Sequence, residues 1–392
     1  MTIAIIITIC TLLLLAYVFD LTSSKTKVPS VILLLFLGFV VQQLTQLFEI
    51  SIPDLTPILP ILGTVGLILI VLEGSLELEF NKSKTTLIRK SFFASLFPML
   101  ALAFLLSFLF QHFGQISFKN SMINAIPLCI ISSAIAIPSV KSLTPYNKEF
   151  IIYESSLSDI IGVLFFTFIA FNDSFGFFSF GYFGLQLIII TVISFIATIG
   201  LAFLLNKIEH HIKFVPIILL VILIYAISEI YHLPALIFIL LFGLFLGNID
   251  ELKHFKWIEK LKPDELNKEV HKFKELTIEA AFLVRALFFL LFGYLIQAKE
   301  ILNTDTLIWA VGIVTAILLF RSVQLKLSKL SLSPLLFIAP RGLITILLFL
   351  AIGPTQNIIF VNKSLIIQVI ILTALIMMLG LMTNKTHDKM EE

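Results

Sequence analysis

The sequence predicts an all-α, polytopic membrane protein with thirteen transmembrane helices. Of its 392 residues, 59% are hydrophobic and only 13% are charged, and its mean hydropathy is +1.07, which is outside the balance of a soluble globular domain. Apolar runs of about 20 residues recur from Ile3 to Met382, each long enough to cross a hydrocarbon core of roughly 30 Å as a helix. The runs lack the alternating polarity of membrane strands, so helices are predicted throughout.

Thirteen such runs follow one another along the chain, and the first is expected to be a retained helix because no cleavage site follows it. Their centres lie near Leu12, Phe36, Leu67, Leu102, Ser132, Leu164, Ser194, Leu223, Leu241, Phe288, Val314, Leu343 and Leu372.

The basic residues support this count, because consecutive spans must alternate sides. With the amino terminus outside, 22 of the 27 lysines and arginines fall on the cytoplasmic side and three on the outer side, and two lie within spans. Positive residues concentrate on the cytoplasmic side of membrane proteins. We therefore expect a multi-pass protein of the plasma (inner) membrane with a cytoplasmic carboxyl terminus. The net charge of +2 gives no support for a nucleic-acid partner.

Four ionisable residues lie deep inside predicted spans, where each needs a partner, water or a function. They are Glu154, Asp159, Arg285 and Arg341. Helix six starts near Glu149, so a rise of 1.5 Å per residue puts Asp159 roughly 15 Å into the membrane, close to its midplane.

Hydroxyl groups accompany this aspartate. Ser155 lies four residues before Asp159 and on the same helical face, and Ser158 precedes it directly. Hard cations bind oxygen ligands, so an acid with adjacent hydroxyls and carbonyls can hold one. The two cysteines, Cys10 and Cys129, lie in apolar spans and are expected to pack as small apolar residues. We expect no cofactor.

Two predicted helices carry breaking residues in mid-membrane. Helix five reads "IPLCIISSAIAIPSV", with Pro127 and Pro138 on either side of Ser132 and Ser133, and helix twelve reads "IAPRGLITI". The second break contains Pro340, Arg341 and Gly342. Proline removes a helical hydrogen bond, so both helices are expected to unwind and expose carbonyls and amides. The two helices run in opposite directions, and paired discontinuous helices in inverted repeats are typical of substrate sites in secondary transporters.

These segments resemble the monovalent cation:proton antiporter superfamily, in particular its Na+/H+ exchanger and NhaP-like group. The segment "YESSLSDIIGVLFF", Tyr153 to Phe166, is similar to the family's E-S-L-L-N-D motif, and "APRGLITILLFLA", Ala339 to Ala351, resembles its arginine–glycine helix. Weaker resemblances are "LGTVGLILIVLEGSLEL", "HLPALIFILLFGLFLGN" and "FFLLFGYLI". Ser158 replaces the family's asparagine, and the helix-five break lacks an acid, as in Kef-type relatives.

The resemblance implies roles for individual residues. It makes Asp159 the Na+ and proton ligand and places the motif's serine at Ser155. Ser158, and Ser132 and Ser133 at the break in helix five, are expected as further oxygen ligands. It implies a structural ion pair between Glu154 and Arg341. Arg285 is a possible additional charge at the site, because an electrogenic branch of the superfamily has a basic residue in the corresponding helix; a structural role for Arg285 is favoured.

The resemblance also implies a homodimer with a mobile core and an interface domain. Interface helices are expected at 1–80, 183–249 and 276–297, and core helices at 90–172 and 304–384. The remainder is a cytoplasmic amphipathic linker at 250–275, with apolar residues at helical spacing around Pro263, and a tail at 385–392.

The predicted function is therefore exchange of a monovalent cation, Na+ in preference to Li+ or K+, for H+ by alternating access, with a part in pH homeostasis. One cation per proton is expected, because one carboxylate titrates. A K+/H+ antiporter or a channel-like relative uses the same scaffold and stays an alternative. A membrane enzyme or scaffold is a remoter one, because His232 with Glu229 near the outer face lacks an obvious nucleophile.

Overall fold

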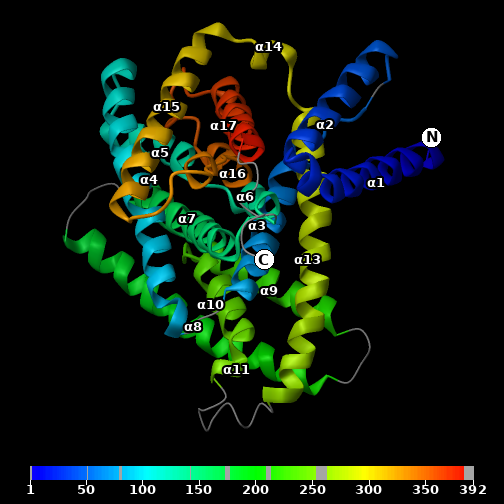
Figure 1. Cartoon of the computed structure of the whole chain (residues 1–392), viewed down its shortest axis with the longest axis vertical. Coiled ribbons are helices and arrows are strands. Elements are labelled where there is room, and N and C mark those ends of the chain that lie inside the picture. The colour runs from blue at the N-terminus through cyan, green and yellow to red at the C-terminus, as the bar shows by residue number, and fades with distance from the viewer. Residues whose placement is uncertain are drawn as a thin grey trace. The chain divides into compact units, whose positions relative to one another are not determined.

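The computed structural model describes residues 2–50, 52–78, 82–141, 143–172, 177–208, 213–252 and 263–383. Across these ranges the chain forms helices and no β-strand, as Figure 1 shows. The first nine elements are α1 (Thr2–Thr26), α2 (Ser30–Leu47), α3 (Ile58–Glu77), η1 (Lys82–Lys84), α4 (Thr85–Gly114), α5 (Phe118–Cys129), α6 (Ser133–Ser139), α7 (Pro145–Phe171) and α8 (Phe177–Lys207). The others are α9 (Phe214–Ile230), α10 (Leu236–Gly247), α11 (Ile249–Leu252), α13 (Pro263–Tyr294), α14 (Ala298–Ile301), α15 (Thr304–Leu327), η2 (Leu335–Phe337), α16 (Leu343–Ala351) and α17 (Lys363–Thr383).

Ten stretches of the described residues are long and apolar enough to span a membrane. They are α1, α2, α3, α4, the α5–α6 pair, α7, α8, α13, α15 and α17. This confirms the predicted all-α polytopic class. The other predicted spans fall on α9 with 17 residues, on α10 with 12, and on the interrupted η2–α16 segment. The exact count of thirteen stays a prediction.

Contacts divide the chain into two compact units. The first comprises Met1–Gly63, Lys90–Phe166 and Arg285–Glu392, and the second comprises Thr64–Arg89 and Thr167–Val284. In the second unit, α10 packs against α8 and α9, and the Asn248 side chain donates to the Leu78 carbonyl at 2.8 Å.

The α5–α6 stretch is the most enclosed part of the first unit. Of its 18-residue apolar window 94% is buried, against 11% of the α1 window. α16 packs against α5, and α6 contacts α1 and α2. Ser117 precedes α5 as its N-cap, and its hydroxyl accepts the Asn120 N–H at 3.2 Å and so satisfies one of the free amides of the first turn. A break in this stretch is thus screened from lipid, which is the condition for non-helical backbone at membrane depth.

The second half of the segment predicted as a linker, 250–275, is part of a longer helix. Residues 263–275 form the first turns of the 32-residue helix α13, which begins at Pro263. Proline is tolerated in the first turn because its missing N–H has no helical partner there, and no breaker follows it. The apolar residues Leu266, Val270 and Phe273 are buried, at the helical spacing that the sequence predicts. Residues 253–262 and the tail 385–392 lie outside the described residues.

Candidate ion-binding site

The first break interrupts the chain between α5 and α6. α5 ends at Cys129, and Ile130 and Ser132 have extended backbone angles, φ −84° and ψ 131° for the first and φ −79° and ψ 115° for the second. α6 then begins at Ser133. Pro127 lies inside α5 and Pro138 inside α6, so the unwound residues fall between the two prolines.

The second break lies between η2 and α16, at residues 338–342. It contains Pro340, Arg341 and Gly342, and α16 begins directly afterwards at Leu343. The two unwound segments touch, because the backbone N–H of Ser132 donates to the Pro340 carbonyl at 2.8 Å. The sequence predicts two discontinuous helices, and we call the place where their unwound segments, 130–132 and 338–342, meet the crossing.

Gly342 permits the close approach at this crossing. A Cβ atom added at Gly342 would lie 2.6 Å from Ile135 Cδ1 and 2.9 Å from Ser132 Oγ. Real Cβ atoms do not come so near to other heavy atoms, so a larger residue here would displace the Ile135 and Ser132 side chains. The choice of glycine is therefore explained by packing between the breaks.

Asp159 lies on α7 beside the first break, with 1% of its surface exposed. Its Oδ2 accepts the backbone N–H of Ser133 at 3.2 Å and also accepts the Ser133 hydroxyl. These donors belong to the first residue of α6, so the carboxylate caps that half-helix at its positive end. The other oxygen, Oδ1, has no hydrogen-bond partner among the described residues. One carboxylate oxygen thus keeps its capacity for a ligand.

The neighbouring serines differ in what their hydroxyls do. Ser158 Oγ accepts the Ile131 N–H at 3.0 Å and so satisfies an amide of the unwound segment. Ser155 donates to the Ile151 carbonyl at 2.7 Å on its own helix, and no hydrogen bond joins it to Asp159. Ser132 Oγ is buried and has no partner within the described part of the chain. Ser132 Oγ and Asp159 Oδ1 are therefore the two predicted ligand atoms that have no hydrogen-bond partner among the described residues.

The buried ion pair at the crossing differs from the expected one. Glu154 binds Arg321 and not Arg341: Nη1 and Nη2 of Arg321 donate to its two carboxylate oxygens at 2.7 and 2.8 Å. The third donor, Nε, reaches the Leu335 carbonyl at 2.7 Å. Arg321 is one of the 22 basic residues that the charge pattern assigns to cytoplasmic loops, whereas α15 continues to Leu327. A signal was present, because Arg321 shares a four-residue spacing with the buried residues Ile313, Ile317 and Leu325.

Arg341 instead binds backbone carbonyls. Its guanidinium group donates to Leu128 O at 3.0 Å, Cys129 O at 3.2 Å and Ala339 O at 2.6 Å. Leu128 and Cys129 end α5, where carbonyls lack helical partners and the helix dipole is negative. The backbone N–H of Arg341 donates to Thr373 Oγ1 at 3.1 Å. Arg341 therefore caps α5 and attaches the second break to α17.

Arg285 is buried in α13 with 8% of its surface exposed. Within the described residues, no group of three or more histidine, cysteine or acidic side chains could hold a metal ion. Apart from Glu154, which is paired with Arg321, the crossing has one acid, Asp159, beside hydroxyl and carbonyl oxygens, and such oxygens are ligands for a hard monovalent cation.

Residues 9–385 match the model of the transmembrane sodium/hydrogen exchanger family. The chain is similar to the structure of the sodium proton antiporter MjNhaP1 from Methanocaldococcus jannaschii at pH 8, with a TM-score of 0.70 and 18% identity over 97% of this chain and 98% of that one. An electron-microscopy structure of the same antiporter gives 0.68 and 18%, over 98% and 95%.

No curated protein sequence matches the chain. The family model nevertheless covers the chain from α1 to the end of α17 and includes both breaks and every candidate ligand. The chain belongs to the sodium/hydrogen exchanger family.

Proposed function

We propose that this chain exchanges Na+ for H+ across a membrane and that Asp159 is the group both ions bind. The observation that carries the proposal is the buried carboxylate of Asp159 at the crossing, with Oδ2 engaged and Oδ1 without a partner among the described residues. Membership of the exchanger family supports the same reaction. The sodium proton antiporter MjNhaP1 has a similar fold.

Na+ would be held by oxygen atoms from α7, from the first break and from the start of α6. Asp159 Oδ1 and Ser132 Oγ provide two buried oxygens with free capacity. Ser133 provides a third once its hydroxyl turns from Asp159 toward solvent or carbonyl acceptors. The Ser155 hydroxyl bonds within α7, and the Ser158 hydroxyl bonds to the Ile131 amide of the break. We therefore assign these two serines to positioning α7 and the break and not to binding Na+.

Competition between the two ions at Asp159 would produce coupled exchange. A carboxylate that holds either Na+ or H+ carries no net charge, whereas the empty ionised form is costly to move through a low-dielectric barrier. Alternating access would then carry only loaded forms across, one Na+ one way for one H+ the other way. The Glu154–Arg321 pair and the Arg341 cap would hold the two breaks in place during this movement.

The moving part would be the predicted core, 90–172 and 304–384, and the interface helices would form a homodimer. The amino terminus would lie outside and the carboxyl terminus in the cytoplasm. These assignments rest on the charge asymmetry of the loops and on the family resemblance.

Proteoliposomes that contain the full chain test the exchange. An imposed Na+ gradient should drive proton flux, read by a trapped pH dye, and Asp159→Asn should abolish it. Asp54→Asn makes the same chemical change at an exposed loop residue and should leave the flux intact. Acid should raise the KM for Na+ and leave the maximal rate at saturating Na+ unchanged, because protons compete for one site. Flux that persists in Asp159→Asn contradicts the proposal, and flux with K+ but not with Na+ or Li+ would instead support K+/H+ exchange.

A further inference from the structure

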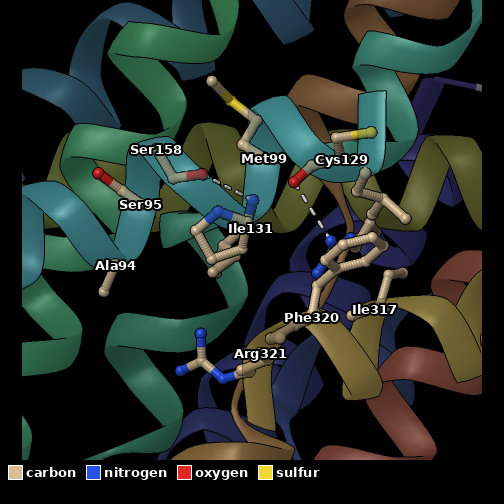
Figure 2. Close-up of a pocket in the computed structure, with 13 residues that line it drawn as sticks. Ala94, Ser95, Met99, Cys129, Ile131, Ser158, Ile317, Phe320 and Arg321 are labelled. Atoms are coloured by element: carbon tan, nitrogen blue, oxygen red, sulfur yellow. Dashed lines mark hydrogen bonds between the residues drawn. The ribbon is translucent and has the colours of Figure 1, made fainter. Parts of the chain in front are cut away.

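A small cavity lies beside the crossing, on the side lined by arginines. Figure 2 shows it between α4, the end of α5, α7 and α15, with Ser95, Cys129, Ser158 and Arg321 among its labelled walls. Arg341 lines it as well, together with apolar residues such as Met99. All these residues belong to the first unit. Neither Asp159 nor Glu154 lines the cavity.

The polar groups around this cavity have unused donors. A guanidinium group has five N–H donors. Arg321 and Arg341 each use three of them within the described part of the protein. The Ser158 oxygen accepts the Ile131 N–H, which leaves its own hydroxyl proton for another acceptor. The Ser95 hydroxyl donates to the Phe92 carbonyl, so it can only accept a further hydrogen bond. The free capacity at the cavity is therefore mainly donor capacity.

The two charged side chains among the residues that line the cavity, Arg321 and Arg341, are both positive. Glu154 neutralises Arg321 through two short hydrogen bonds, whereas the guanidinium group of Arg341 forms its hydrogen bonds, within the described residues, with carbonyl oxygens and with no carboxylate. Carbonyls and a helix end offset part of a positive charge, and an anion offsets it fully. Buried donors and an uncompensated guanidinium group favour an anion over a cation.

About 20 Å³ of the cavity is open to the centre of a water molecule. Roughly 10–15 Å³ of such volume holds one water. A single-atom anion, which is only slightly larger than water, is admitted by this space, whereas carboxylic acids and sulfate are not. We propose that the cavity binds a small monovalent anion of the halide class between Arg321 and Arg341.

The anion is linked to the transported ion, a step that rests on the proposed function. The four charged side chains at the crossing, Glu154, Asp159, Arg321 and Arg341, sum to zero when Asp159 is ionised and empty. They sum to +1 when Asp159 holds Na+ or H+. The halide therefore binds the loaded forms more tightly, and by reciprocity it raises the affinity for Na+ by the same factor.

Thermal unfolding of the purified full chain in detergent tests the site without transport. Chloride replaces gluconate stepwise at constant Na+ and constant ionic strength. A ligand that binds only the folded state shifts the unfolding equilibrium by 1 + [L]/Kd, which is about elevenfold at ten times Kd. Chloride and bromide should raise the Tm with saturation, and radiolabelled chloride should bind at one per chain. The proposal is overturned if the Tm is equal in all anions. It is also overturned if the purified protein binds no radiolabelled chloride, which would mean that the cavity holds water alone.

Two valine variants on α4 locate the effect. Ala94 lines the cavity, so Ala94→Val fills it and should remove the chloride shift. Ala103 is equally buried on the same helix but does not line the cavity, so Ala103→Val should keep the shift. Ser158→Ala removes one donor and should weaken chloride binding severalfold, which is a second reading if Ala94→Val fails to fold. A chloride shift that survives Ala94→Val, or that Ala103→Val also loses, overturns the assignment.

The link to Asp159 is separable from the site itself. Chloride should bind at least fivefold more tightly in Na+ than in a large organic cation, a typical coupling between two sites. In Asp159→Asn, where the side chain is always neutral, chloride should bind equally tightly in both media. Chloride binding that never depends on Na+ retains the anion site but contradicts the link and the Na+ role of Asp159.

Discussion

Arg321 donates to both carboxylate oxygens of Glu154, at 2.7 and 2.8 Å, although 167 residues separate them in the chain. Its third bond, to the Leu335 carbonyl, holds η2 just before the second break. The pair therefore joins α7, α15 and η2 at one point. Both side chains are nearly fully buried, with 1% of the Glu154 side chain and 4% of the Arg321 side chain exposed.

Removal of one member of this pair should be strongly destabilising. Glu154→Gln leaves a buried guanidinium group without a counter-charge, a change that costs about 3–5 kcal/mol of unfolding free energy. Arg321→Met likewise leaves the buried carboxylate of Glu154 without a counter-charge. The double variant Glu154→Gln/Arg321→Met should lose clearly less unfolding free energy than the two single variants lose in sum. Unfolding of the purified protein measures all three.

Lys141 provides the control, because it forms an exposed ion pair with Asp20 at 3.2 Å, with 52% of the lysine side chain exposed. Lys141→Met should cost at most about 1 kcal/mol. If Glu154→Gln costs no more than Lys141→Met, the buried pair does not hold the crossing together.

Gly162 on α7 should fix the position of the first break. A Cβ atom added there would lie 2.3 Å from Ile130 Cδ1 and 2.4 Å from Ile130 Cγ1. Ile130 begins the unwound segment, so Gly162→Ala should displace it and move Ser132 and Ser133 away from Asp159. We expect a loss of Na+-driven proton flux in proteoliposomes of tenfold or more, together with a raised KM for Na+.

Two further variants separate this effect from helix propensity. Gly200 on α8 has no atom within 4 Å of an added Cβ, so Gly200→Ala should leave flux unchanged and stabilise its helix by up to about 1 kcal/mol. Ile130→Ala in the Gly162→Ala background removes the clashing atoms and should restore much of the flux. Equal activity of Gly162→Ala and wild type would show that the contact does not position the break.

Ser158 should stabilise the break through the Ile131 amide. Ser158→Ala leaves that buried N–H without an acceptor, which costs about 1–3 kcal/mol, and the change is measured by chemical unfolding. Ser156 is the matched control two residues earlier on α7, because its buried hydroxyl has no partner among the described residues. Ser156→Ala should be neutral or slightly stabilising. Identical costs for the two alanines would contradict the capping role of Ser158.

The sequence predicts the helices and both breaks because these depend on local properties. Apolar runs fix the spans, and Pro340 and Gly342 mark one break from composition alone. The burial of Asp159 within a helix is also predictable from the apolar run around it, although α7 begins at Pro145, four residues before the expected start near Glu149. Pairing between distant segments is not local, so the family resemblance predicts Arg341 as the partner of Glu154, whereas the structure has Arg321 in that position.

The error at Arg321 has a physical cause. Charged residues near the end of an apolar run are counted into the adjacent loop, yet α15 continues for six residues beyond Arg321. The spacing of buried residues along a helix carries the missing information. Similarly, the hydroxyl of Ser155 shares a face with Asp159 but bonds to its own helix, a choice that residue spacing does not determine.

Exchange should be electroneutral, because one carboxylate carries either one Na+ or one H+. The charges of Glu154, Arg321 and Arg341 accompany both loaded forms equally, so they add the same charge to the outward and the inward movement. Na+-driven proton flux should therefore be independent of a membrane potential clamped with valinomycin and K+ gradients. Electrical recording from proteoliposomes on a solid-supported membrane should show no steady current. A steady current would mean that a second titrating group moves with the site, and Arg285→Gln, which removes the remaining deep basic residue of the sequence, would then identify whether that group is Arg285.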